Sequence, residues 1–391
     1  MISRKSASLL LVAPLALLLV AGFVVPIGIA VLRAFDNPEI STTLPRTTLA
    51  LEQWDGTDLP PEAVFAALVA DMAGVTDSRG FGALTRRLNF ETTGLRATLS
   101  KTRNNSAALA PPFSQSLPAL DPTWGAPDIW RLLKQHSSPH TATYVLRALD
   151  LRYAPTGEIV AVSPDQAIFR ELYLRTFTMS AVVTLITVLL GYPTAWYMST
   201  LKGRAASVAM MCVLVPFWIS ILVRSAAWFI LLQREGLING LLQVARLIEE
   251  PVAMIFTRPA VYVAMVHVLL PFFILPLLSV MRRQRADYLR AAASMGAKPW
   301  QQFLWIYLPL TMPGVTAGAL MVFMLAVGFY ITPALVGGLK DQMIGYYIDY
   351  FTSHTINMGM AAALSVLLLL FTGIILLLAG RMLPSITGGR P

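Results

Sequence analysis

The sequence has little charge and almost no cysteine. Of its 391 residues only 13% are Asp, Glu, Lys or Arg and 56% are hydrophobic, whereas an ordinary soluble domain carries about 25% charged residues. This balance excludes an ordinary soluble domain and indicates a polytopic membrane protein. The one cysteine, Cys212, lies in an apolar run, so a disulfide within the chain is impossible and nothing suggests redox chemistry.

Motifs for catalysis and metal binding are also missing. No G-x-x-x-x-G-K-[ST] stretch occurs, so the chain is not expected to cradle phosphates or to hydrolyse ATP alone. The four histidines lack the spacing of metal ligands, and neither H-E-x-x-H nor G-x-S-x-G is present. We therefore expect no enzyme activity, no cofactor and no metal. The histidines are His136, His140, His267 and His354.

What the sequence does have is long apolar segments. Spanning a bilayer takes roughly 20 helical residues, and six stretches are long enough: Ala7–Leu32, Arg175–Thr200, Ala206–Leu232, Pro259–Met281, Thr311–Leu335 and Gly359–Gly380. The first follows a basic "ISRKSAS", but it is longer than the roughly 7–15 apolar residues of a signal peptide and lacks a convincing cleavage site. We expect a retained helix and an all-α polytopic fold with six transmembrane helices.

Lysine and arginine in the short flanks predict the orientation. On one side of the membrane they are Arg4, Lys5, Lys202, Arg204, Arg282, Arg283, Arg285, Arg290, Lys298, Arg381 and Arg390. The short loops of the other side hold only Arg234, Arg246 and Lys340, with Arg258 at a border. Both termini are therefore predicted to be cytoplasmic, with the spans among membrane lipids. The net charge of +9 follows from topology, and nucleic-acid binding is not expected.

Residues 34–170 form a mixed-polarity insert, predicted to be an extracytoplasmic domain, between span one (1–33) and the membrane core (171–391). Its segments "LPPEAVFAALVADM" and "APDIWRLLKQ" are predicted helices, and "LDLRYAPTGEIVAV" a hairpin. The stretch "KTRNNSAALAPPFSQS" is typical of a loop. Ser163 as N-cap and Pro164 at the first position predict the start of the helix that enters span two. The role of the insert is not predicted.

Between spans four and five the cytoplasmic loop 282–310 contains "YLRAAASMGAKPWQQFLWIYLP". Its alanines and leucine favour a helix, and Gly296 stands where a left-handed C-terminal residue is expected. Pro299 suits the first position of a second helix. The second helix would carry one apolar stripe of Trp300, Phe303, Leu304, Tyr307 and Leu308, ended by Pro309. A plain amphipathic connector would share these features.

The spacing in this loop resembles a known family. Ala291, Ala292, Gly296, Ile306, Leu308 and Pro309 keep every interval of the cytoplasmic signature loop of ABC importer permeases. Arg290 replaces the glutamate of that pattern, and Asp287 one turn earlier is a candidate substitute acid. Over roughly residues 174–380, "LVPFWISILVRSAAWFILLQREGLIN", "GYPTAWYMS" and "GFYITPALVGG" resemble the spermidine/putrescine-type subgroup.

The resemblance implies a function and partners. The chain would be a permease subunit in a bacterial inner membrane, and loop 282–310 would dock on a cytoplasmic ATPase dimer. A sister permease and a periplasmic solute-binding protein would complete the importer. Polyamines are the implied solute, with opines or amino-acid derivatives as alternatives. The rival classes are a secondary transporter, which should show charged or discontinuous helices in symmetry-related halves, and a membrane-anchored receptor, which would leave the other five spans unexplained.

Polar and aromatic residues near the predicted spans are candidates for the translocation pathway. They are Arg224, Trp228, Glu235, Tyr330 and Asp341, with His267, Asp349, Trp218 and Tyr346 as further candidates. Acids and aromatic faces would suit an elongated cation. Each residue also has a plainer interpretation, because arginine snorkels, acids in loops are solvated, and Trp and Tyr gather at membrane interfaces.

Overall fold

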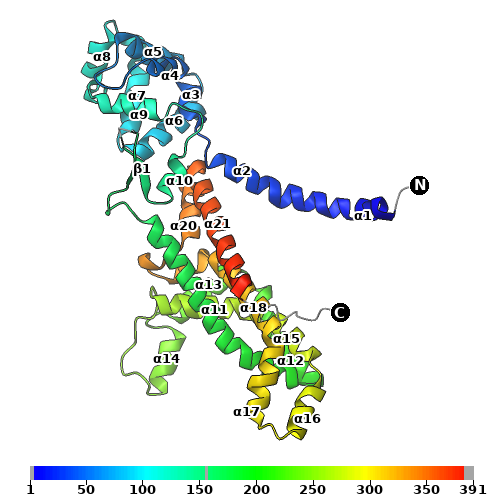
Figure 1. Cartoon of the computed structure of the whole chain (residues 1–391). Helices are drawn as coiled ribbons and strands as arrows, with labels where there is room; N and C mark the ends of the chain where they lie inside the picture. The colour runs from blue at the N-terminus through cyan, green and yellow to red at the C-terminus, as the bar shows by residue number, and fades with distance from the viewer. Residues whose placement is uncertain (1–3, 155–156, 383–391) are drawn as a thin grey trace. The chain divides into compact units, whose positions relative to one another are not determined.

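The computed structural model describes residues 4–154 and 157–382 (Figure 1). It divides into two compact units. One takes the residues up to Arg170 together with Ile348–Leu367, and the other takes Glu171–Tyr347 and the residues from Leu368 on.

The first unit contains the insert, whose helices are short and joined by tight turns. The elements up to residue 161 are α1 (Arg4–Leu19), η1 (Val20–Val24), α2 (Val25–Arg33), α3 (Pro38–Thr43), α4 (Pro45–Glu52), α5 (Glu62–Gly74), α6 (Ser78–Glu91), α7 (Leu95–Asn105), η2 (Ser106–Ala108), α8 (Phe113–Leu120), η3 (Pro122–Gly125), α9 (Pro127–Gln135), α10 (Thr143–Arg147), β1 (Leu151–Tyr153) and β2 (Ile159–Ala161). This unit also contains η7 (Tyr350–His354) and the part of α21 (Met358–Met382) up to Leu367.

The core of the insert forms around aromatic side chains. Phe65 of α5 lies against Trp130 of α9 with ring centroids 4.6 Å apart, and Trp124 lies 5.2 Å from Trp130. Each buried indole has an acceptor, since the Trp124 Nε1 donates to Thr102 Oγ1 and the Trp130 Nε1 to the Trp124 carbonyl. The two predicted helices are confirmed as α5 and α9, and the hairpin as the antiparallel pair β1–β2. Its turn residues Pro155 and Thr156 lie outside the described residues.

Two predictions for the insert were wrong. The stretch predicted as loop is largely helical, in α7, η2 and α8, because packing against the core overrides weak local propensity. The helix that enters span two, α11 (Phe169–Thr200), begins at Phe169 and not at Ser163. Its first amides donate to the Asp150 carboxylate, at 3.0 Å from Phe169 N and 2.7 Å from Arg170 N. A cap from a residue 19 positions away leaves no local signal.

The second unit consists of helices. After α11 they are α12 (Gly203–Leu214), η4 (Val215–Trp218), α13 (Ile221–Leu231), α14 (Leu237–Val244), α15 (Arg258–Arg283), α16 (Ala286–Ser294), α17 (Pro299–Gln302), η5 (Phe303–Tyr307), α18 (Leu308–Val327), α19 (Ile331–Val336), η6 (Leu339–Asp341) and α20 (Ile344–Asp349). Helices α16 and α17 lie side by side at one end of this unit (Figure 1).

The described residues contain five helices that are long and apolar enough to cross a membrane, or six if one bent pair is counted as a span. The polytopic all-α prediction is therefore confirmed. The predicted third span, 206–232, is the bent pair: Gly203–Trp218 and Ile221–Leu231 meet at 100°, because Ile219 is extended between them. The predicted fifth span also differs, since the long helix runs from Pro299 to Val327 and α19 is separate.

Three glycines bring the central helices of the second unit close together. A Cβ on Gly191 of α11 would stand 2.4 Å from the ring of Phe273 of α15, and a Cβ on Gly318 of α18 would stand 2.8 Å from the other edge of that ring. A Cβ on Gly314 would lie 3.1 Å from the Leu277 Cα. Small residues at such contacts let transmembrane helices pack backbone to backbone, so α15 and α18 form a tight pair.

Candidate functional site

Helix α16 ends in the turn that the sequence predicts. The Ala297 N–H donates to the Ala292 carbonyl and the Gly296 N–H to the Ala293 carbonyl, both at 3.0 Å, which is a Schellman motif. Gly296 has φ +85°, a backbone conformation that residues with a Cβ adopt at a cost. Ala292 is 2% exposed. Helix α16 therefore ends at a fixed point, and we call the segment from α16 to Leu308 the elbow.

The second arm of the elbow starts at Pro299, also as predicted. The Lys298 N–H donates to Gln301 Oε1 at 2.8 Å, and Gln302 Nε2 donates to the Ala297 carbonyl at 2.7 Å. These bonds satisfy donors and acceptors at the turn that no helix would satisfy. The elbow is thus held by its own hydrogen bonds on both sides of Gly296.

The predicted single apolar stripe is divided into two faces. Phe303 and Tyr307 stack on each other, and Phe303 also meets Tyr192 and Trp196 of α11 with centroids 6.0 and 6.5 Å away. The π-helical turn η5 inserts an extra residue per turn here, so it changes which side chains share a face. Pro309 does not end the helix: the long helix from Pro299 to Val327 continues through it, and the π-helical turn η5 lies directly before it.

Several large apolar side chains of the elbow are exposed. Met295 is 82% exposed, Trp305 75% and Trp300 56%, with Tyr288 and Leu304 beside them in the sequence and also exposed. Arg290 and Ala291 are exposed as well, whereas Ile306 and Leu308 are partly buried. Asp287, the candidate substitute acid, pairs with Arg285 at 3.1 Å. We call Met295, Trp300, Leu304 and Trp305 the elbow surface; its composition is that of the centre of a protein interface.

Arg224 lies at the break in the third predicted span. Its Nη2 donates at 2.7 Å to the carbonyl of Ile219, the residue whose extended backbone separates the two halves. The Arg224 Nε is buried and has no hydrogen-bond partner among the described residues. The side chain also lines a cavity of about 290 Å³ whose other walls are apolar and aromatic. A charged group in such a setting marks a candidate functional residue of a membrane protein.

Trp228, also on α13, contacts a residue of α15. Its Nε1 donates to His267 Nδ1 at 3.2 Å, and the two rings meet edge to face with centroids 5.5 Å apart. Nearby, the Ser225 and Thr332 hydroxyls share a buried hydrogen bond of 2.9 Å, which sequence analysis did not find. Helix α13 is therefore tied to both α15 and α19 by polar contacts, which are valuable where water is excluded.

The remaining pathway candidates do not join Arg224 and Trp228 in one cluster. Asp341 is buried, and its carboxylate accepts from Arg258 Nε at 2.9 Å and from the Gly338 N–H at 3.2 Å. Glu235 is exposed in the turn before α14, and Tyr330 is the residue before α19, beside Gly345. Of the further candidates, Trp218 is exposed, Tyr346 contacts Tyr347, and Asp349 accepts from the Ser353 hydroxyl in the first unit.

The insert contains a buried ionic cluster that sequence analysis missed. Arg87 pairs with Glu91 at 2.6 Å, donates to Asn37 Oδ1 at 2.8 Å and contacts His136 Nδ1 at 3.2 Å. Burial and then the Arg87 charge lower the pKa of His136 to about 4. Burial alone would raise the pKa of Glu91, but the Arg87 charge and other nearby positive groups outweigh burial and lower it. Only the i, i+4 spacing of Arg87 and Glu91 could have indicated any of this.

No group of three or more His, Cys, Asp or Glu side chains that could hold a metal ion was found in residues 4–154 and 157–382. The candidate functional features of the second unit are instead the exposed apolar side chains of the elbow and a charged residue, Arg224, at a broken span. Both features belong to a helical protein with helices long and apolar enough to cross a membrane.

Residues 166–387 match the model of the binding-protein-dependent transport system inner membrane component family. The chain belongs to this family. It is therefore a multi-pass inner-membrane transport subunit, and the resemblance to ABC importer permeases of the spermidine/putrescine type is confirmed.

Two curated relatives are permeases of Escherichia coli (strain K12). The spermidine/putrescine transport system permease protein PotB is 34% identical over 214 residues, which cover 55% of this chain and 78% of the relative. The inner membrane ABC transporter permease protein YdcU is 34% identical over 226 residues, covering 54% and 71%. A bacterial alginate ABC transporter with a bound periplasmic protein is similar at 17% identity and a TM-score of 0.45, covering 59% of this permease chain and 85% of the other.

Proposed function

We propose that this permease carries small polyamines such as spermidine or putrescine across the inner membrane, as one subunit of an importer driven by a separate ATPase. A periplasmic solute-binding protein would deliver the solute, and a sister permease would form the other half of the pathway. The observation that carries the proposal is the identity of 34% to a spermidine/putrescine permease over the membrane core. The family description itself includes dependence on a binding protein.

The elbow surface is the proposed docking point of the ATPase. A protein that pushes on the membrane helices needs a stiff contact, and the Schellman turn at Gly296 together with the bonds from Gln301 and Gln302 supports such stiffness. The exposed Met295, Trp300 and Trp305 would supply the buried centre of the interface. Because α15 leads into the elbow and α18 leads out of it, both spans would move with it.

Solute passage is proposed to depend on α13. The bent pair interrupts the helix, and broken helices in transporters line cavities rather than lipid. Arg224 would hold the break through the Ile219 carbonyl, and Trp228 with His267 would position α13 against α15. Glu235 and Tyr330 are also proposed to line the pathway. Asp341 would have a supporting role through Arg258.

Uptake in whole cells tests the proposal. Cells that lack the chain should lose uptake of radiolabelled spermidine, and the wild-type gene should restore it. Trp228→Phe, which keeps an aromatic ring and removes the donor to His267, should reduce the restored rate, and Tyr197→Phe, at an exposed position that is not among the pathway candidates, serves as the control. Unchanged spermidine uptake without the chain, with loss of uptake of another solute, would overturn the polyamine assignment but leave the importer assignment standing.

A further inference from the structure

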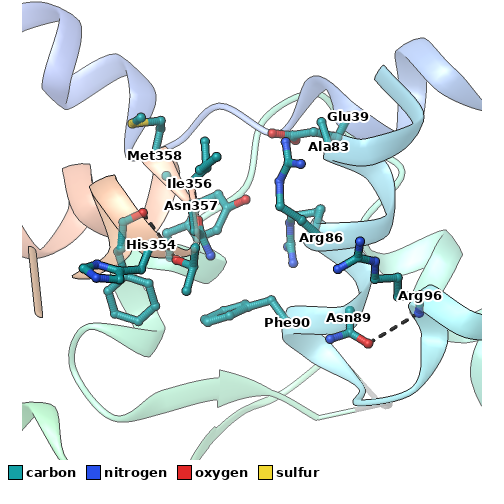
Figure 2. A pocket seen from close by; sticks show the side chains of 15 residues that line it. Glu39, Ala83, Arg86, Asn89, Phe90, Arg96, His354, Ile356, Asn357 and Met358 are labelled. Atoms are coloured by element: carbon teal, nitrogen blue, oxygen red, sulfur yellow. Dashed lines mark hydrogen bonds between the residues drawn. The ribbon is translucent and has the colours of Figure 1, made fainter. Parts of the chain in front are cut away.

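A cavity of about 500 Å³ opens within the first unit (Figure 2). Small-molecule sites have volumes of roughly 300–1,000 Å³. One wall carries Arg86, Asn89 and Phe90 of α6, and the opposite wall carries His354, Ile356 and Asn357 (Figure 2). The insert and the segment before α21 therefore build one cavity together.

Two arginines that line the cavity have no acidic partner among the described residues. Arg86 and Arg96 are exposed, and neither forms an ion pair with a carboxylate among the described residues, whereas Arg87, one residue from Arg86, is buried and paired with Glu91. Asn89 fixes the chain around Arg96, since its Oδ1 accepts from the Gly94 and Arg96 amides at 3.0 and 3.4 Å. Two guanidinium groups at one cavity are suited to carboxylates, which they bind with paired hydrogen bonds.

One carboxylate of the same cavity lacks a donor. Glu39 lines the cavity near Ala83 and Arg86 (Figure 2), and its Oε2 is buried with no hydrogen-bond partner among the described residues. A buried carboxylate oxygen without a donor is costly. A ligand ammonium group would supply both the hydrogen bond and the opposite charge.

The wall of the cavity is also strained. Ile356 has φ +53°, which is exceptional for a β-branched residue, and the preceding turn, η7, is π-helical. Strained residues and π-turns concentrate at functional sites and ligand clamps. Gly359 lies so close to Tyr144 that a Cβ would come within 2.3 Å of its ring, so α21 and α10 pack tightly where both line the cavity.

We propose that this cavity binds a small amino-dicarboxylate, with its two carboxylates on Arg86 and Arg96 and its ammonium group on Glu39. The site offers two positive charges and one negative charge, and the ligand carries the complement. Phe90 and Tyr144 contact the carbon chain between the charged ends. A polyamine is excluded from this cavity because the arginines repel it. The site is thus a second ligand site, additional to the proposed polyamine pathway.

Isothermal titration of the full-length chain in detergent tests this site, with L-glutamate as the amino-dicarboxylate probe, glutarate as the same dianion without the amine, and spermidine as the polycation. L-Glutamate binds more tightly than glutarate, and spermidine gives no heat that depends on Arg86. Arg86→Gln and Arg96→Gln each lower the binding affinity for both anions by about tenfold or more. Arg79 is an exposed arginine of the same helix outside the cavity, and Arg79→Gln leaves the affinities for both anions unchanged.

Glu39→Gln tests recognition of the ligand's ammonium group separately from recognition of its carboxylates. This variant binds L-glutamate no more tightly than glutarate, and its affinity for glutarate equals that of the wild type. Glu52→Gln, exposed on α4, is the matched control. Binding of neither anion to the wild type, or binding that survives Arg86→Gln and Arg96→Gln, overturns the proposal whatever the uptake assay for spermidine shows. Uptake of radiolabelled L-glutamate then distinguishes a transported solute from a ligand that stays bound to the insert.

Discussion

Gly318 of α18 lies directly against Phe273 of α15. A Cβ at position 318 would stand 2.8 Å from Phe273 Cδ2 and 3.0 Å from the Phe273 carbonyl oxygen, and Phe273 is fully buried. The backbones of the two spans that flank the elbow are therefore in contact near their middle. A push on the elbow would displace them together rather than separate them.

Any side chain at position 318 should force α15 and α18 apart. We expect Gly318→Val to lower the free energy of unfolding by about 1–3 kcal/mol, the usual cost of overpacking, and to lower the thermal unfolding temperature in detergent. Gly373→Val on α21 is the control, because nothing lies within 4 Å of a Cβ there. Equal unfolding temperatures for both variants would contradict the close contact.

The turn of the elbow depends on backbone conformation and not on space. A Cβ at Gly296 meets nothing within 4 Å, but φ is +85°, and an L-residue in this region costs about 1–2 kcal/mol. Gly296→Val should therefore leave the protein in the membrane and reduce ATP-driven uptake strongly. Gly296→Asn should retain most of the activity, because asparagine tolerates the left-handed region. Equal loss in both variants would indicate that side-chain size and not φ matters.

Substitutions at Asp341 test whether this residue stabilises the fold or binds the solute. Because its carboxylate is held by Arg258 and the Gly338 amide, Asp341→Asn should lower the free energy of unfolding by about 1–2 kcal/mol, and Arg258→Gln should do the same. The double variant should lose less than the sum of the two. If Asp341→Asn instead raised the KM for spermidine without any loss of stability, the residue would belong to the solute site.

The His136 cluster predicts an acid-sensitive insert. The folded pKa of about 4 lies below the usual value of about 6.5, so the unfolded chain binds a proton between these values and the folded chain does not. The stabilisation is complete above pH 6.5 and is lost as the pH falls towards 4, by about 3 kcal/mol at most. The lowered pKa of Glu91 adds a further loss at still lower pH.

Thermal unfolding of the full chain, followed by tryptophan fluorescence, measures this effect, since Trp124 and Trp130 are buried in the insert. His136→Gln should reduce the change of the unfolding temperature between pH 6.5 and pH 4. His140→Gln should not, because that side chain is 79% exposed. An unaltered slope in His136→Gln would assign the acid sensitivity to other groups.

Local pattern predicted much of this molecule and could not predict the rest. The stripe of Val64, Phe65 and Leu68 predicted α5, and Gly296 with Pro299 predicted the turn of the elbow, because both signals lie within a few residues. The Asp150 cap of α11 and the Ser225–Thr332 bond link residues far apart in the chain. The break at Ile219 also escaped, since hydropathy records apolar length and not the direction of the helix.

The most direct test of the account is a crosslink from the elbow surface. In a Cys212→Ser chain, Trp305→Cys carries a thiol-reactive photo-crosslinker, and Leu369→Cys, exposed on α21, carries it as the control. The account predicts that position 305 captures an ATP-hydrolysing protein from native membranes, that position 369 does not, and that Gly296→Val weakens the capture. Capture of no nucleotide-hydrolysing protein at position 305 would contradict the central claim that an external ATPase drives this permease through its elbow.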